Sequence, residues 1–186
     1  MTYAPRVRPY GVAPFVGPYS IHGQLMLFGG VTNTPTSATY PASNRAYYFP
    51  VVIPSACTIY RFFWLNGATA STNNIQVGVY ADNDAGTDGP GTAILRGTST
   101  LASGANVCQF DNVTDTALDK GRYWLAIWGS GTTTTIFRGS PSGSLLRHVN
   151  GYLESGLASG LPSTATPAQN TTPYMPVFGF TTVSAP

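Results

Sequence analysis

One stretch, residues 121–129, constrains the fold of this chain more than any other. It reads Gly-Arg-Tyr-Trp-Leu-Ala-Ile-Trp-Gly. Successive side chains of an extended strand point to opposite faces, so the odd-numbered apolar residues fall on one side and Trp124 and Trp128 on the other. Both sides carry large apolar groups, and the stretch therefore predicts a central strand of a β-sandwich. We expect a second sheet to cover one face, and a neighbouring chain or an ordered arm to cover the other.

From residue 45 onward the sequence reads as short strands separated by turn residues, with no convincing amphipathic helix. Residues 74–80 alternate between apolar and polar, as a half-buried strand does. Strands recurring at such intervals are typical of a sandwich or barrel and not of βαβ units. About eight of them in two sheets suit an all-β, antiparallel jelly roll. The predicted strands are 46–53, 57–65, 74–80, 93–98, 107–110, 121–129, 133–138 and 174–183.

Residues 1–44 differ from this pattern and are interpreted as an extended N-terminal arm before a sandwich domain of residues 45–186. Prolines punctuate the segment, and each one fixes φ and removes a backbone donor. Disordered tails are poor in aromatic residues, whereas this segment is rich in them. It is therefore expected to dock, either on a partner or on the domain's own sheet. The candidate partner-binding residues of the arm are Tyr3, Arg6, Arg8, Tyr10, Phe15 and Tyr19.

The chain is poor in charge. Charged residues make up 9% of its 186 residues, against roughly 25% in an average soluble domain. Either much of the surface packs against other protein, or the chain is an extracellular or virion domain with a Thr/Ser surface. The net charge of +2 comes from scattered basic residues, which argues against a nucleic-acid partner. No segment approaches the ~20 apolar residues of a membrane span, and the N-terminus lacks the apolar run of a secretory signal. We therefore expect assembly in a cytosol.

The sequence contains few motifs that indicate catalysis or metal binding. The two histidines, His22 and His148, lie in the arm and in an ambiguous region, and no serine sits in a Gly-x-Ser-x-Gly elbow. Glycoside hydrolysis needs facing carboxylates, but the single glutamate is isolated. We expect no enzyme and no cofactor. The loop with Asp82, Asp84 and Asp88 is a weak calcium candidate, since the same residue types are those that tight turns require.

Two further features leave alternatives open. Cys57 and Cys108 match no metal or redox motif, and buried free thiols are favoured over a disulfide between neighbouring strands. The aromatic residues of the predicted strands either line an exposed face that stacks on sugars or form the core and interfaces. The second interpretation is favoured, because buried aromatic residues dominate cores and interfaces. Trp124 and Trp128 are accordingly candidate partner-binding residues.

Three motifs in this order resemble known proteins. They are Tyr48–Pro54 followed by Thr58–Arg61, then Val77–Asp82 with Gly89–Thr92 and Leu95, and finally Leu118–Ala126. The order resembles the β-sandwich domains of tailed-bacteriophage virion proteins, which occur in head decoration (cement) proteins, head fibres and tail-fibre or receptor-binding proteins. The resemblance covers about residues 45–183, and residues 1–44 have no counterpart in it.

The resemblance implies a jelly roll that is often trimeric and has no enzymatic activity. It implies a virion structural subunit whose partners are the major capsid protein or other virion subunits. The short chain favours a capsid decoration or head-fibre subunit, with the arm anchoring and the sandwich clamping. Contacts made only in the assembled shell would oppose its dissociation. The alternatives are a phage tail or fibre subunit that recognises host surface glycans, and a secreted carbohydrate-binding or adhesion module.

Overall fold

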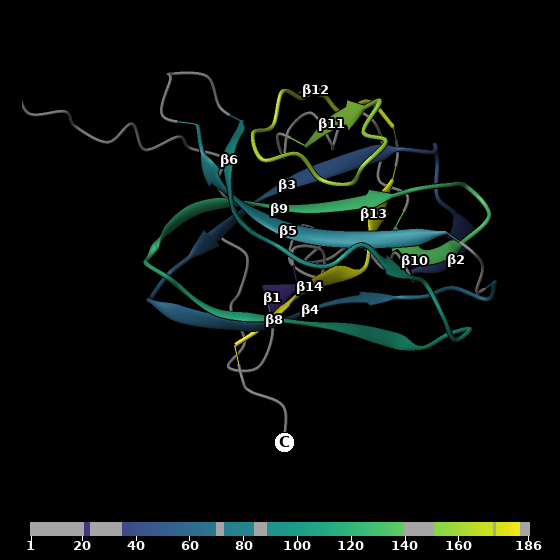
Figure 1. Cartoon of the computed structure of the whole chain (residues 1–186), viewed down its shortest axis with the longest axis horizontal. Helices are drawn as coiled ribbons and strands as arrows, with labels where there is room; N and C mark the ends of the chain where they lie inside the picture. Colours follow the sequence, from purple (N-terminus) through teal and green to yellow (C-terminus); the bar gives the residue numbers. More distant parts are fainter. Residues whose placement is uncertain are drawn as a thin grey trace, which may run out of the picture.

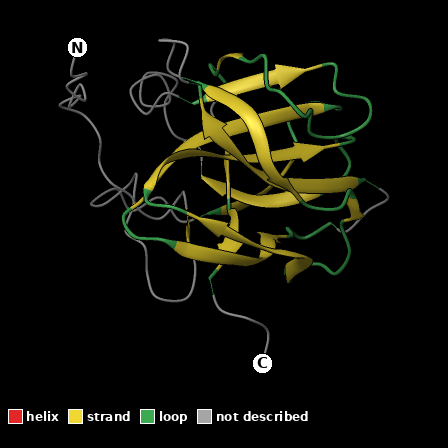
Figure 2. Ribbon diagram, turned by 60° about the vertical axis from the view of Figure 1, so that its left-hand side comes forward, coloured by secondary structure: helices red, strands yellow, loops and turns green. Residues whose placement is uncertain are grey.

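The computed structural model describes residues 21–22, 35–69, 73–83, 89–139, 151–172 and 174–182. This part of the chain is all-β, and it contains no helix (Figure 2). The strands are β1 (Ile21–His22), β2 (Thr36–Thr39), β3 (Arg45–Ile53), β4 (Cys57–Leu65), β5 (Asn74–Asp82), β6 (Pro90–Arg96), β7 (Thr100–Leu101), β8 (Cys108–Leu118), β9 (Gly121–Gly129), β10 (Thr135–Gly139), β11 (Tyr152–Ser155), β12 (Ala168–Gln169), β13 (Met175–Pro176) and β14 (Phe178–Thr181).

These strands form antiparallel sheets of two main layers. The seven-stranded sheet has the order β12-β11-β3-β9-β5-β6, with β7 also pairing β5, and the four-stranded sheet has the order β1-β14-β4-β8. A small sheet, β13-β10-β2, lies between them at one end (Figure 1). The all-β, antiparallel class is as predicted. The described strands number more than the expected eight, because pairings of two to four residues are too short to show alternation in the sequence. A jelly-roll connectivity stays a proposal.

Strand β9 occupies the central position that its sequence predicts. It pairs with β3 along its whole length on one side and with β5 on the other. Its inward side chains Leu125 and Ile127 join the main core, which lies between the two large sheets. Phe62 and Trp64 of β4 meet them from the four-stranded sheet, and both are fully buried. The core is therefore closed by aromatic and β-branched side chains from both layers.

The outer face of β9 is covered by the chain itself, which corrects the expectation of a neighbouring chain or an arm. A second apolar cluster there joins Tyr48, Tyr80, Trp124 and Trp128 to side chains from residues 152–165. In Figure 1, β11 and the chain that follows it lie over β3 and β9. Hydrophobic burial is not directional, so any nearby apolar segment can satisfy it. The alternation in β9 predicts that its outer face is covered, but it does not predict which segment covers it.

The last residues of the expected arm pair and pack with the sandwich. Strand β2 pairs with β10, and β1 pairs with β14 at the edge of the four-stranded sheet. Tyr40 is 1% exposed, and the carbonyl oxygens of Arg45 and Ile127, each 3.0 Å from its hydroxyl oxygen, share its single donor proton. Residues 36–40 are thus part of the sandwich. The arm residues Tyr3, Arg6, Arg8, Tyr10, Phe15 and Tyr19, and the ambiguous segment around His148, lie outside the described residues.

Candidate functional site

Trp124 and Trp128, predicted as partner-binding residues, are fixed inside the molecule. They are 0% and 3% exposed. The indole nitrogen of Trp124 donates to Asp82 Oδ1 at 2.6 Å, and that of Trp128 donates to the carbonyl oxygen of Leu157 at 2.9 Å. Tyr152 packs edge-on against Trp124, with ring centroids 5.3 Å apart. In this fold both rings are core residues and present no surface to a partner or to a sugar.

The weak calcium candidate Asp82 already has protein partners. Besides the bond from Trp124, its Oδ2 lies 3.8 Å from Arg122 Nη1. Asp84 and Asp88 lie outside the described residues. Across the part of the chain that is described, no group of three or more His, Cys, Asp or Glu side chains could hold a metal ion. The geometry around Asp82 instead fits a carboxylate that fixes an indole and a guanidinium.

Glu154 is also used to hold the fold. Its carboxylate accepts from the Tyr48 hydroxyl at 2.9 Å and from Thr166 Oγ1 at 2.9 Å. Burial, followed by the nearby Tyr80 and Glu154, raises the pKa of Tyr48 far above its ordinary value. Tyr48 is therefore a neutral donor at physiological pH. The contact joins β3 to β11 and to the segment after it.

The two cysteines are free and lie at opposite ends of one strand pair. Cys57 faces Leu118 and Cys108 faces Leu65 in the β4–β8 ladder. Eight residues of strand separate the two positions, about 26 Å at 3.3 Å per residue. They cannot bridge each other. The favoured free thiols are therefore found, although Cys108 is exposed and only Cys57 is partly buried.

The best candidate for a functional surface is one that sequence reasoning missed. Five large apolar side chains of the described residues are clearly exposed, namely Val52, Ile94, Leu101, Val107 and Phe110. The last three are the most exposed, at 47–49%, and fall within ten residues on the connection from β7 into β8. We call Leu101, Val107 and Phe110 the apolar tip. Leu101 pairs with Asn74 in the seven-stranded sheet and Phe110 pairs with Phe63 in the four-stranded sheet, so the apolar tip borders both large sheets. Exposed apolar side chains of this size are candidates for a contact surface.

A polar network centred on the buried Asn66 holds the backbone of the apolar tip. Asn66 is 0% exposed, and its Nδ2 donates to the Ser103 carbonyl oxygen at 2.7 Å and to Gln109 Oε1 at 2.9 Å. Its Oδ1 accepts from the Trp64 indole at 2.9 Å. Gln109 in turn donates to the Leu101 carbonyl oxygen and accepts from the Ser103 amide, both at 2.9 Å. A satisfied buried network of this kind rigidifies the segment it joins.

Two more contacts shape the surface beside the apolar tip. The guanidinium of Arg61 lies 4.8 Å from the ring centroid of Phe110, within cation–π range. Asp111, the next residue of β8, accepts a 2.7 Å bond from the Thr98 amide through Oδ2. This bond ties β8 to the connection that leaves β6. Phe110 is thus an exposed ring on a strand that is held from both sides.

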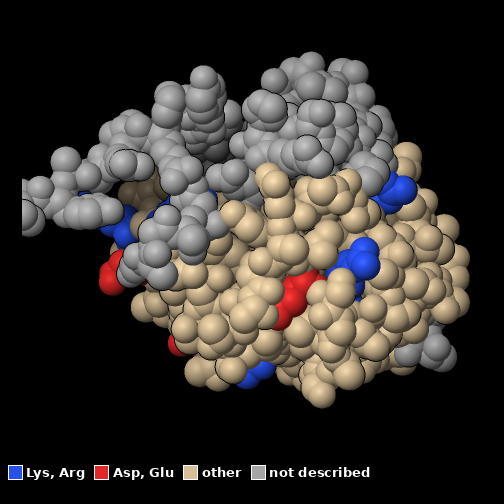
Figure 3. Space-filling model, turned by 90° about the horizontal axis from the view of Figure 1, so that it is seen from above, with Lys and Arg blue, Asp and Glu red and all other residues tan. Residues whose placement is uncertain are grey.

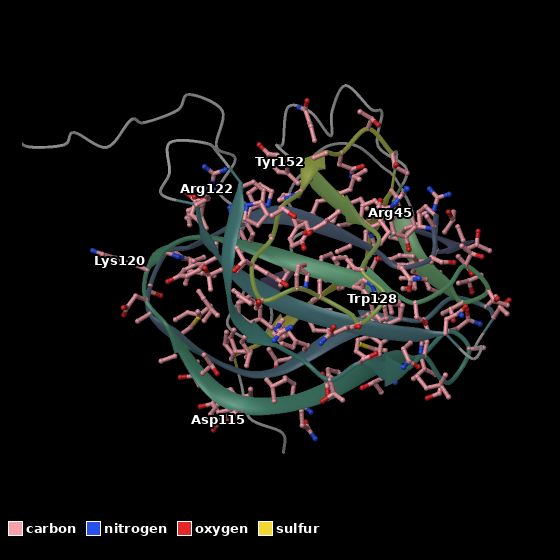
Figure 4. All side chains as sticks on the ribbon, turned by 45° about the horizontal axis from the view of Figure 1, so that its top comes forward. Arg45, Asp115, Lys120, Arg122, Trp128 and Tyr152 are labelled. Carbon is pink, nitrogen blue, oxygen red and sulfur yellow. The ribbon has the colours of Figure 1, made fainter. Side chains whose placement is uncertain are left out.

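Charged side chains are sparse over the visible surface. Figure 3 shows them in small separate groups on the face it presents, with uncharged residues between. Figure 4 places Asp115 on β8, on the opposite side of the molecule from Tyr152. The apolar tip therefore lies on a molecule whose surface charge is low, which reduces the desolvation cost of covering it with another protein.

Comparison with known proteins does not assign this surface. No family model matches the chain, and no curated protein matches it. Among the described residues, no helix is long and apolar enough to cross a membrane.

Proposed function

We propose that this chain is a non-enzymatic structural subunit that acts by binding other protein surfaces, in the manner of a phage capsid decoration or head-fibre protein. The observation that carries the proposal is the apolar tip. Three exposed apolar side chains lie there on a backbone held by a polar network centred on the buried Asn66, in a chain poor in charge. Such preorganisation lowers the entropy cost of binding.

The use of the acidic side chains supports a structural role. Asp82 holds an indole, Glu154 holds a tyrosine and a threonine, and Asp111 holds a backbone amide. A general acid or base needs a proton-transfer partner in a substrate, and each of these carboxylates is instead bonded to the protein. The virion location and the capsid partner rest on the sequence resemblance.

The two apolar faces of β9 do not require a homotrimer, because the chain covers both of those faces itself. A homotrimer rests on the sequence resemblance alone. The apolar tip is now the candidate contact between subunits, or between this chain and a capsid protein. The alternative function, recognition of host glycans by a tail or fibre subunit, rests on the half-exposed ring of Phe110, because Trp124 and Trp128 are buried.

A paired substitution tests the proposal. We expect the double variant Leu101→Ser/Phe110→Ser to weaken self-association or particle attachment at least tenfold, since buried apolar anchors carry most of the energy of an interface. The control is Val52→Ser/Ile94→Ser, which removes two exposed apolar side chains elsewhere. Sedimentation of the full chain measures self-association, and imaging of labelled chain on intact virions measures attachment.

Equal self-association and attachment of the two double variants would contradict the apolar tip as the contact surface. A signal on a glycan array that Phe110→Ser abolishes would favour the alternative function, recognition of host glycans.

A further inference from the structure

The segment that covers the outer face of the seven-stranded sheet has the features of a bound peptide. We call residues 156–165 the strap. It leaves β11, crosses over β3, β9 and β5, and reaches the edge at β6 (Figure 1). Within it the only β-pairing is the isolated bridge between Thr164 and Thr92. The contacts of the strap with the sheet therefore hold it in place.

Side chains of the sheet bind the main chain of the strap. Arg96 Nη1 donates to the Leu161 carbonyl oxygen at 2.6 Å, and the Tyr80 hydroxyl donates to the Pro162 carbonyl oxygen at 2.6 Å. Gln76 Oε1 accepts from the Leu161 amide at 2.7 Å. Trp128 also donates to the carbonyl oxygen of Leu157. All four of these hydrogen bonds join a side chain of the sheet to a main-chain atom of the strap, and none involves a side chain of the strap. Backbone recognition of this kind is how proteins bind extended peptides.

One apolar side chain anchors the strap. Leu161 is 2% exposed and joins the cluster of Tyr80, Trp124 and Trp128. Its Cδ1 would lie only 3.0 Å from a Cβ at Gly78, so the absence of a side chain there makes room for it. Beyond Leu161 the strap adds to the free edge of β6, through the Ala93 amide to Ser163 at 2.8 Å and the Ala165 amide to Gly91 at 3.0 Å.

We propose that this face is a peptide-binding site which the chain fills with its own strap, and that it also accepts the strap of a second copy. The ligand class is a peptide that turns ahead of a leucine followed by proline, as residues 157–162 do. The strap suits exchange because it contributes no strand of its own to the sheet. Two copies have the same sequence, so a strap that moves to the other copy makes the same contacts there. The strap in place competes with the incoming one, which lowers the apparent affinity of the intact chain. The proposal does not depend on the virion assignment.

Two glycines of the strap provide a matched pair of variants. Gly160 has φ +102° and Gly156 has φ +81°, both in the left-handed region where a side chain is strained. A Cβ at Gly160 would collide with Gln76 Oε1, whereas a Cβ at Gly156 would meet nothing within 4 Å. Gly160→Ala therefore disturbs the seating of Leu161, and Gly156→Ala introduces backbone strain alone.

The experiment uses the full chain and a fluorescent synthetic peptide with the sequence of residues 155–167. We expect fluorescence polarisation to show that the peptide binds Gly160→Ala at least tenfold more tightly than it binds the wild type or Gly156→Ala. A peptide carrying Leu161→Asp should not bind. Sedimentation should show a concentration-dependent dimer of Gly160→Ala that the unlabelled peptide dissociates.

Three outcomes would overturn the inference. The first is that the Gly160→Ala variant unfolds cooperatively, and is therefore folded, but does not bind the peptide. The second is that the Leu161→Asp peptide binds as tightly as the wild-type peptide. The third is a peptide-binding variant that stays monomeric at every concentration, which excludes the second copy as the occupant. Should Gly160→Ala fail to fold, Leu161→Ala in the full chain replaces it. That change weakens the anchor of the strap and leaves the sheet side chains of the site intact, so it is expected to raise the affinity for the peptide at least threefold.

Discussion

The outer faces of the two large sheets carry apolar residues, but only one of these faces is fully covered by the described chain. On the seven-stranded sheet, Trp124 and Trp128 lie under residues 152–165 and are almost completely buried. On β8 of the four-stranded sheet, the ring of Phe110 is 47% exposed. The difference is that residues 152–165 pack over the two tryptophans, whereas no described segment covers Phe110 fully. Function is therefore to be sought where apolar residues are rigidly held and remain exposed, and not where they are most numerous.

The largest contrast is expected between Trp124→Ala and Phe110→Ala. Removing the buried indole should lower the free energy of unfolding by about 3–5 kcal/mol, because it empties a packed cluster and leaves Asp82 without its donor. Phe110→Ala should cost less than about 1 kcal/mol, since half of the ring is already in water. Urea unfolding of both variants measures the difference. Equal losses would mean that the strap-covered face contributes no more to stability than the exposed one.

A second variant tests whether the apolar tip is held by its network. Asn66→Ala should destabilise the chain by about 2–3 kcal/mol, because it leaves the buried Trp64 indole without a partner and removes the bond to the Ser103 carbonyl oxygen. Hydrogen exchange should also accelerate in residues 101–107. Asn112→Ala, at an exposed position of β8, is the control and should change stability by less than about 0.5 kcal/mol. Unchanged exchange in Asn66→Ala would show that the tip is rigid for another reason.

The smallest effect concerns Asp111, which joins β8 to the connection after β6. Burial raises the pKa of this carboxyl above its ordinary value, and the bond from the Thr98 amide opposes that rise only in part. The folded state therefore binds the proton more tightly than the unfolded state, and stability is lost as pH rises through the folded pKa. Asp111→Asn keeps an acceptor for Thr98 without the charge. It should be slightly more stable than the wild type at pH 7, by about 1 kcal/mol or less.

The pH profile distinguishes this explanation from a simple packing effect. The advantage of Asp111→Asn should shrink as pH falls from 7 toward 4, because the wild-type carboxyl becomes neutral in the fold. Urea midpoints across that range measure the trend, with Asp115→Asn on the exposed side of the same strand as the control. An advantage that grows on acidification would contradict the direction of the shift.

Sequence reasoning placed the long buried strands well. The segments 57–65 and 121–129 match β4 and β9 at both ends, because residues buried on both faces form unbroken apolar runs. It shortened β8, predicting 107–110 where the strand runs Cys108–Leu118. The aspartates of β8 are typical of turns, and its outer face is exposed, so the apolar signal is lost. The short strand β11 was not predicted, since its place comes from pairing with β3.

The candidate site was less predictable than the fold. The tryptophans expected at an interface are internal, whereas Phe110 is a single aromatic residue beside polar ones and gives no signal of a surface in the sequence. Its significance arises from Asn66 and Gln109, which lie 43 residues apart in the chain and meet only in the folded state. Local periodicity contains no information about such a pairing. A side-chain network of this kind can be found only after the strands have been placed.

By itself, the sequence determined that this chain is built of antiparallel strands and that both faces of residues 121–129 must be kept from water. That follows from the two-residue period of a strand and from the size of the side chains on each side. Only the tertiary structure decided that residues 152–165 provide the outer cover and that Leu101, Val107 and Phe110 receive no full cover from the described residues. The physical reason is that apolar burial fixes how much surface must be hidden, while the path of the chain decides which segment hides it.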